Sequence, residues 1–473
     1  MYKKVWDFKE KLDDAWEAIA EKDFDIQYGD GFFHLENHGE NEAPIYIRPC
    51  SIYGDKIDIQ FAKNYPGAGI FVFGFLAGFE YINFHFDFSK QYLKIFTHEF
   101  HKHQPRFEGK ITRKLLSKIS VIRNTDTLKD VPYEGSEVKL LFDDYEVVKL
   151  GNIDFLPECL FMFGLKGKGT LTLSSFSIEG KQRPRPEYLR VGIWQQSTKP
   201  TTKENVDALI RGTKIAAESE VQILVTPETS LTGLRISKEL MDRNHIQKEL
   251  LRFQKAISKI NNAPYVLIGY PEWIDGKKIE GATEKLVRIN CHRFVRPDGT
   301  LGPMMAKVHS CEEGFWHGRN YNFQRVCGTE VAVGICHDGH YQDVWAVCVM
   351  GGARLCLHPS AGGRLTGKIP EIVNSYRMLG TDLDAFWVRV NAGGGSCIVY
   401  PCKNRKQKET ILAVPDDLTE KNPSYPDYSY MGDLFACAKI RLWDATGCYP
   451  LRTLRNGRKY NIWKQLIPEI QEV

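Results

Sequence analysis

The chain has 473 residues, of which 42% are apolar and 26% charged, and its formal net charge at pH 7 is +4. This length suits two domains better than one core. So small a net charge gives no reason to expect nucleic acid or a membrane as partner. The N-terminus is charged throughout and no apolar run approaches the ~20 residues of a spanning helix, so neither a secretory signal nor a membrane span is expected. We therefore expect a cytoplasmic protein whose 12 cysteines are reduced.

The first part of the chain, residues 1–185, is patterned at period two, as half-buried strands are. Phe84–Phe88 alternates strictly, and Asp143-Asp144 separates two further strands as a hairpin turn. Leu160–Leu165 and Thr170–Ile178 are expected as two separate strands. Many strands and few helical stretches predict an antiparallel β-sandwich domain.

From residue 188 to residue 473 the pattern changes to strands that alternate with helices, after a polar link that contains prolines. Helical spacing of apolar residues is found around Val206 and Leu209 and over Leu240–Ile260. The expected strands are Leu189–Trp194, Val221–Val225, Tyr265–Gly269, Val331–Ile335, Ala353–Leu357 and Trp387–Val390. This alternation predicts an α/β domain.

Three ionisable residues of this second part stand at or near the ends of expected strands: Glu228, Lys307 and Cys336. Proteins of the α/β class place their sites at such ends. Each residue alone also has a simpler interpretation, since a glutamate there is usually a surface residue and a cysteine there is usually part of the core. Their order and their flanking segments decide between these interpretations.

Those segments resemble the nitrilase, or carbon–nitrogen hydrolase, superfamily. The matching segments are Thr226–Gly233, Ala306–His309, Gly334–Asp338, Gly351–Arg354, Arg377 and Val390–Gly393. The resemblance places the family's catalytic glutamate, lysine and cysteine on Glu228, Lys307 and Cys336. It implies a four-layer α-β-β-α sandwich over roughly residues 188–465, no cofactor, and a homodimer or larger homo-oligomer.

Within the family, Cys336–Trp345 and Glu313–Gly318 are most similar to the aliphatic amidase and formamidase branch. This similarity puts the family's auxiliary glutamate on Glu313, with Glu312 as the competing assignment. His337 and His340 depart from the pattern of that branch and are candidate substrate-binding residues.

The chemistry of the family explains these residue types. A thiol attacks as its thiolate, and a carboxylate such as Glu228 can take its proton and return it to the leaving amine. Lys307 and the backbone N–H of His337 would stabilise the oxyanion. We also expect Cys336 to be the most readily alkylated cysteine, because Lys307 would stabilise its thiolate.

The expected reaction is hydrolysis of a non-peptide C–N bond of a small amide or carbamoyl compound through a thioester, with release of ammonia or an amine. Nitrile hydrolysis and acyl transfer are the alternatives on the same site. An inactive binding or scaffold protein is the alternative from another class, and the presence of all three catalytic residue types argues against it.

Other polar residues near these segments have more than one interpretation. His309, His317, His337 and His340 could suggest a metal site, but their spacing fits no standard zinc pattern and no metal is expected. Asp338 is expected to form structural hydrogen bonds. Cys311 is expected to be structural and Arg364 to be a solvated loop residue, although a redox role and a carboxylate-binding role respectively stay open.

The N-terminal domain resembles concanavalin-like or laminin-G-like jelly rolls in its strand pattern. Such folds often bind carbohydrate, but fold does not imply function. The alternatives are that the domain binds a carbohydrate, or that it packs on the hydrolase domain, shapes its entrance or builds an oligomer.

Overall fold

A computed structural model of the chain divides into two compact units, whose main parts are Met1–Pro184 and Arg185–Leu454. The structure describes residues 2–13, 15–18, 23–47, 56–63, 67–77, 80–99, 102–111, 116–124, 136–153, 160–180, 185–233, 242–279, 281–362, 380, 383–401, 411–415, 433–445 and 471–473. Arg364 and Arg377 lie outside these described residues. Among the helices that the structure describes, none is long and apolar enough to cross a membrane.

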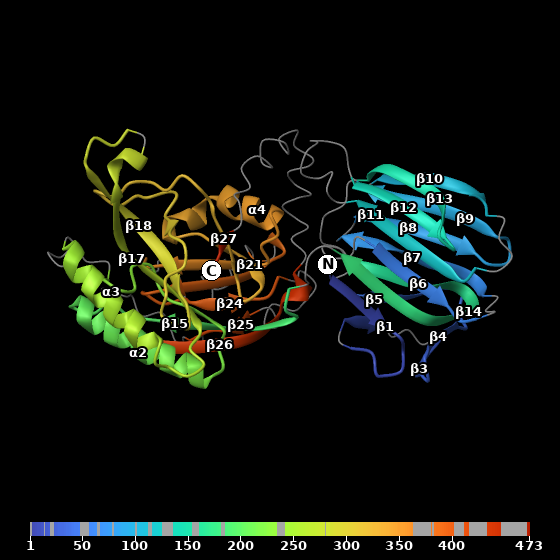
Figure 1. Ribbon diagram of the computed structural model, residues 1–473, viewed down its shortest axis with the longest axis horizontal. Coiled ribbons are helices and arrows are strands. Elements are labelled where there is room, and N and C mark those ends of the chain that lie inside the picture. The colour runs from blue at the N-terminus through green and yellow to red at the C-terminus, as the bar shows by residue number, and fades with distance from the viewer. Residues whose placement is uncertain are drawn as a thin grey trace. The chain divides into compact units, whose positions relative to one another are not determined.

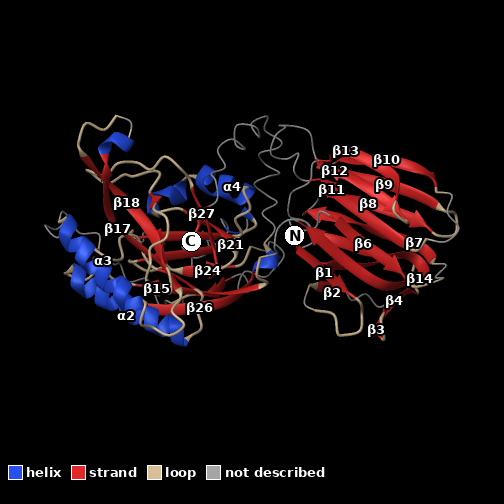
Figure 2. Ribbon diagram, viewed as in Figure 1, coloured by secondary structure: helices blue, strands red, loops and turns tan. Residues whose placement is uncertain are grey.

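The first unit is rich in β-structure, as the strands drawn in red show (Figure 2). Its strands are β1 (Tyr2–Trp6), β2 (Trp16–Ala18), β3 (Phe24–Gly29), β4 (Phe32–Asn37), β5 (Glu42–Ile47), β6 (Lys56–Phe61), β7 (Ala68–Ala77), β8 (Glu80–Asp87), β9 (Tyr92–Glu99), β10 (Lys102–Lys110), β11 (Lys118–Asn124), β12 (Ser136–Phe142), β13 (Tyr145–Ile153) and β14 (Leu160–Gly180). The predicted hairpin is confirmed, since β12 pairs antiparallel with β13. Its turn residues Asp143 and Asp144 have φ of 49° and 67°, as a type I′ turn requires.

One strand of the first unit corrects an expectation from the sequence. Leu160–Leu165 and Thr170–Ile178 are not separate strands but the two halves of β14, which is 21 residues long. The first half pairs with β5 and β7, and the second half pairs with β4 and β6. The strand continues because Gly169 already pairs with β4, so backbone pairing passes from one set of neighbours to the next without a turn.

The core of the first unit is built from aromatic residues at alternate strand positions. Phe73 and Phe84 lie on neighbouring strands and stack with their ring centroids 4.9 Å apart. Phe163 on β14 is fully buried and contacts the rings of Trp16 and Phe33. Alternation puts these side chains on one face of each strand, and their burial is a large source of stability.

The second unit contains two sheets and several helices (Figure 1). The six-stranded sheet has the order β19 (Met305–Ala306), β18 (Leu286–Val295), β17 (Tyr265–Asp275), β16 (Ile223–Val225), β15 (Tyr188–Gln195) and β26 (Leu434–Arg441). The seven-stranded sheet has the order β25 (Ile411–Ala413), β24 (Cys397–Val399), β23 (Phe386–Asn391), β22 (Leu355–Ser360), β21 (Thr329–Val333), β20 (Asn322–Val326) and β27 (Gln471–Glu472). The main helices are α2 (Thr202–Glu218), α3 (Arg243–Ile257) and α4 (Gln342–Met350).

Three apolar clusters show how these elements pack. One cluster joins the facing sides of the two sheets, with Val191 and Val225 from one sheet and Val333 and Leu357 from the other. A second cluster joins the six-stranded sheet to α2 and α3. A third joins the seven-stranded sheet to α4. The two sheets therefore share one apolar core, and strand ends of both sheets can contribute to one site.

Candidate active site

The three residues singled out in the sequence follow three different strands. Glu228 follows β16 and Lys307 follows β19, both in the six-stranded sheet. Cys336 follows β21 of the seven-stranded sheet and begins the short helix η3 (Cys336–His340). The structure brings the three side chains together, because the two sheets pack face to face.

Lys307 lies between two carboxylates. Its ammonium donates to Oε1 of Glu228 at 2.8 Å and also to Oε1 of Glu312. The Lys307 side chain is fully buried and the Glu228 side chain is 1% exposed, whereas that of Glu312 is 28% exposed. Glu312 is held further by the hydroxyl of Ser310 at 2.8 Å. The result is a buried cation with one fully buried and one partly exposed carboxylate.

Of the two competing glutamates, the structure places Glu312 on Lys307 and not Glu313. Glu313, which the amidase similarity favoured, is exposed. Its backbone oxygen accepts a hydrogen bond from Arg288 at 3.4 Å. Neighbouring residues of a loop point in different directions, and here only the first of the two points toward Lys307.

The pKa shifts of these groups follow from burial and charge. Burial raises the pKa of Glu228, although the charge of Lys307 and hydrogen bonds from Lys307 and Cys336 act in the opposite direction. Burial alone would lower the pKa of Lys307, but the charge of Glu228 and its hydrogen bond outweigh burial and raise it. Burial alone would also raise the pKa of Glu312, but its hydrogen bond to Lys307 lowers it. Lys307 is therefore a cation throughout the neutral range.

Cys336 is a partly buried thiol in a strained backbone position. Its φ is 46°, in the left-handed region that non-glycine residues rarely adopt. The Ser360 hydroxyl lies 3.5 Å from its Sγ, and the backbone of Ala361 also hydrogen-bonds to the thiol. These donors and the Glu228 carboxylate surround the sulfur.

The electrostatics of Cys336 correct one expectation from the sequence. Burial, together with the negative charge of Glu228, raises the pKa of Cys336 to about 12, although Lys307 acts to lower it. The resting sulfur is therefore a thiol rather than a thiolate stabilised by Lys307. Its activation requires transfer of the proton to a base, and Glu228 is hydrogen-bonded to it.

Asp338 joins the segment that carries Lys307 to the segment that carries Cys336. Its buried carboxylate accepts hydrogen bonds from the backbone N–H groups of Val308 at 3.2 Å, His309 at 2.7 Å and Ile335 at 2.9 Å. The structural hydrogen bonding predicted for Asp338 is confirmed. Because the three donors adjoin Lys307 and Cys336 in the sequence, this carboxylate fixes the two segments relative to each other.

A buried histidine supports the backbone of Cys336. Nε2 of His358 lies 2.9 Å from the carbonyl oxygen of Cys336. A Cβ at Gly339 would come within 2.5 Å of the His358 ring, so a side chain at position 339 would displace it. Burial lowers the pKa of His358 to about 3, which keeps the imidazole neutral.

The remaining candidates form the surroundings of this centre. His309 stacks on Tyr341 with ring centroids 3.7 Å apart. His337 and His340 make an edge-on contact with ring centroids 5.2 Å apart. Cys311 is exposed. Within the part of the chain that the structure describes, no group of three His, Cys, Asp or Glu residues could hold a metal ion.

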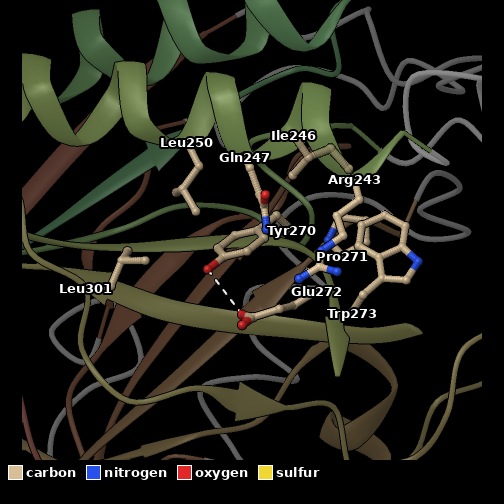
Figure 3. Close-up of a pocket in the computed structure, with 9 residues that line it drawn as sticks. All are labelled: Arg243, Ile246, Gln247, Leu250, Tyr270, Pro271, Glu272, Trp273 and Leu301. Carbon is tan, nitrogen blue, oxygen red and sulfur yellow. Dashed lines mark hydrogen bonds between the residues drawn. The ribbon is translucent and has the colours of Figure 1, made fainter. Parts of the chain in front are cut away.

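A separate pocket of this unit lies between α3 and β17 (Figure 3). It is formed by Arg243, Ile246, Gln247 and Leu250 of α3, by Tyr270, Pro271, Glu272 and Trp273 of β17, and by Leu301. The phenol of Tyr270 donates to Glu272 at 3.3 Å (Figure 3). Asn290 of the neighbouring strand β18 is not among the residues that line this pocket, and its side chain donates to Glu228. The pocket is therefore not part of the Glu228–Lys307–Cys336 site.

Three contacts of the site were not foreseen from the sequence. The Ser360 hydroxyl and the Ala361 backbone contact the sulfur, and Asn290 donates to Glu228 at 2.9 Å. Ser360 ends β22 and could have been found by the same strand-end argument that singled out Glu228. Asn290 lies within β18 and carries no such signal.

A family model of the carbon–nitrogen hydrolases matches residues 190–411. A comparison with curated proteins finds no match. Among solved structures, an amidase from Nesterenkonia sp. matches at 16% identity over 58% of this chain and 98% of its own, with a TM-score of 0.44. A double mutant of the amidase from Nesterenkonia sp. AN1, in complex with acrylamide, matches at 16% identity over 55% of this chain and 93% of its own, with a TM-score of 0.42.

The family match covers the strands and loops that carry Glu228, Lys307 and Cys336. By this match, residues 190–411 are identified as a carbon–nitrogen hydrolase domain.

Proposed function

We propose that the site hydrolyses the C–N bond of a small primary amide or carbamoyl compound through a thioester on Cys336, with release of ammonia. The observation that carries this proposal is the buried Lys307 ammonium between Glu228 and Glu312, beside a thiol that hydrogen-bonds to Glu228. This arrangement provides a nucleophile, a base and a positive charge in one place.

The first step is attack on the carbonyl carbon. Glu228 takes the proton of the Cys336 thiol as the sulfur forms its bond to carbon. The raised pKa of Glu228 suits this transfer, because it brings the pKa of the base closer to the pKa of the Cys336 thiol. The carbonyl π electrons move to oxygen and form an oxyanion.

The oxyanion needs donors that are already in place. An ammonium has three N–H groups, and two of those on Lys307 are directed to Glu228 and Glu312. The third is available for the oxyanion, and the backbone N–H of His337 is the second proposed donor. Collapse of the intermediate breaks the C–N bond, and Glu228 gives its proton to the leaving nitrogen.

Water then hydrolyses the thioester by the same route. Glu228 takes a proton from the water, the hydroxide adds to the thioester carbon, and the C–S bond breaks. The thiolate regains the proton from Glu228, which restores the site. Glu312, which stays ionised because Lys307 lowers its pKa, would accept a hydrogen bond from the substrate NH2.

The packing of the sheets and helices also supports the four-layer arrangement that the family resemblance implies. We propose a four-layer α-β-β-α sandwich, with the facing sheets as its inner layers and α2, α3 and α4 in its outer layers. Assembly as a homo-oligomer and a carbohydrate ligand on the first unit stay predictions.

Ammonia release from matched primary amides and nitriles tests the reaction type. A nitrile lacks the NH2 group that Glu312 would bind, and an unpaired carboxylate costs about 1–3 kcal/mol or more. The amide of each pair should therefore react about 10-fold to 100-fold faster. Comparable turnover of an amide and its nitrile would assign the protein to nitrile hydrolysis instead.

The neighbouring glutamates offer a matched pair of variants. Glu312→Gln should lower kcat/KM for amides by about 10-fold to 1,000-fold, because it removes a charged partner of Lys307 and of the substrate. Glu313→Gln should leave kcat/KM within about 2-fold, because surface substitutions away from such features have small effects. The reverse pattern would return the auxiliary role to Glu313.

A further inference from the structure

Asn290 contacts both the glutamate and the lysine of the site. It lies in β18 and is 2% exposed. Its side-chain Nδ2 donates to Oε1 of Glu228 at 2.9 Å. Its backbone oxygen accepts from the backbone N–H of Lys307 at 2.8 Å. Two different parts of one residue therefore hold two catalytic groups.

The two oxygens of Glu228 are not equivalent. Oε1 accepts from Asn290 at 2.9 Å and from the Lys307 ammonium at 2.8 Å. The hydrogen bond with the Cys336 thiol is the third contact of the same carboxylate. Two fixed donors on one oxygen restrict rotation of the carboxylate, and neither of them occupies the other oxygen, Oε2.

We infer that Asn290 is a positioning residue that, together with Lys307, occupies Oε1 of Glu228 and leaves Oε2 to take the proton of Cys336. This inference rests on the proposed role of Glu228 as the base. An amide suits the position because it donates to a carboxylate and cannot take up the proton in its place.

The surroundings of Asn290 show that its amide is committed to Glu228. Its Oδ1 is buried and has no hydrogen-bond partner among the described residues. An unpaired buried acceptor is unfavourable, and a hydrogen bond to a charged group is stronger than one to a neutral group. The Asn290 amide therefore keeps the orientation in which Nδ2 donates to Glu228, although Oδ1 is left without a partner among the described residues.

The side chain and the backbone of Asn290 can be separated by substitution. Any residue at position 290 keeps the backbone carbonyl that holds Lys307. Asn290→Ala removes the donor, and Asn290→Asp removes it while keeping the size of the side chain. Asn322 is the matched control, since its buried Nδ2 donates to the backbone oxygens of Ala306 at 2.9 Å and Val333 at 3.2 Å and to no carboxylate.

The test measures the rate at which iodoacetamide alkylates Cys336 in the full chain as a function of pH, by peptide mapping, together with kcat/KM for a primary amide. Loss of a donor destabilises the ionised form of Glu228, so its pKa rises. On the acid side of each profile, the pH at which the rate reaches half of its maximum is called the acid midpoint. Asn290→Ala should raise this midpoint in both profiles by about one pH unit. It should also lower kcat more than it raises KM. Asn290→Asp should move the midpoint at least as far, because it adds a like charge. Asn322→Ala should leave the midpoint in place.

The outcomes separate this inference from the proposed reaction. A wild-type midpoint in both Asn290 variants, or the same shift in Asn322→Ala, would overturn the positioning role. If Asn290→Ala does not fold, the isosteric Asn290→Asp decides. A shift of the alkylation midpoint without turnover of any amide would support the positioning role and overturn the proposed reaction, since alkylation needs no substrate.

Discussion

The two units of the chain bury different kinds of side chain. In the described part of the first unit, the buried polar side chains are those of Asn37, Thr97, Ser120 and Arg123, within a core dominated by aromatic rings. The second unit has apolar clusters of similar kind, but it also buries Glu228, Lys307, Asp338, His292 and His358. Buried ionisable groups are costly unless they are paired and hydrogen-bonded. In the second unit, Glu228 and Lys307 are paired with each other and Asp338 accepts backbone hydrogen bonds, so the buried charges around Cys336 are compensated.

The largest expected effect comes from removing the buried cation. Lys307→Met should lower kcat/KM for amides by at least about 1,000-fold, because the oxyanion loses its charged donor. It should also lower the free energy of unfolding by about 3–5 kcal/mol, since Glu228 and Glu312 lose their shared counter-charge. Steady-state kinetics and urea titration measure the two effects.

A surface lysine provides the control for that variant. Lys203 pairs with Asp207 at 3.0 Å and its side chain is 68% exposed. Lys203→Met should change the free energy of unfolding by less than about 1 kcal/mol and leave kcat/KM unchanged. Equal destabilisation by both lysine variants would contradict the account of a buried, paired cation.

The first unit should respond in stability alone. Phe163→Ala removes a ring that contacts Trp16, Phe33, Phe71 and Phe176 in the core. The cavity should lower the free energy of unfolding by about 3–5 kcal/mol. Under conditions where the protein stays folded, kcat/KM should not change. A loss of kcat/KM larger than about 10-fold in folded Phe163→Ala would contradict the expectation that the core of the first unit affects stability and not activity.

A smaller effect concerns the pH dependence of stability in the second unit. Burial lowers the pKa of His358 to about 3, below the value of about 6.5 for an exposed histidine. Between these values the unfolded chain binds the proton and the folded chain does not, so this histidine makes stability fall as the pH falls. His358→Gln removes the proton uptake and can still donate to the Cys336 carbonyl.

The comparison of His358→Gln with the wild type isolates this group, because the other titrating groups cancel. From about pH 6 to pH 4 the difference in unfolding free energy should change by about 1.4 kcal/mol per pH unit in favour of His358→Gln. Urea titrations at several pH values measure it. A difference that is constant over this range would show that His358 is not held neutral by the fold.

The sequence predicted those parts of the molecule that depend on local pattern. The Asp143-Asp144 hairpin follows from turn chemistry, and the family follows from the segments around Glu228, Lys307 and Cys336. Alternation within strands predicted a β-rich first unit.

The sequence could not predict the features that depend on contacts between residues far apart in the chain. Glu312 and Glu313 are adjacent, and only the position of Lys307 selects Glu312. The continuity of β14 depends on which strands pair with it, and the high pKa of Cys336 depends on burial. Asn290 has no local signal, since an asparagine within a strand gains meaning only from the carboxylate that it faces.

The most direct test of the central claim is to trap the covalent intermediate. The full chain is mixed with a primary amide that reacts slowly, quenched in acid within one turnover, and digested for mass spectrometry. The acyl group should be found on the peptide that contains Cys336, should be absent in Cys336→Ala, and should form more slowly in Glu228→Gln. An acyl group on another cysteine such as Cys311, or undiminished turnover by Cys336→Ala, would contradict the assignment of Cys336 as the nucleophile.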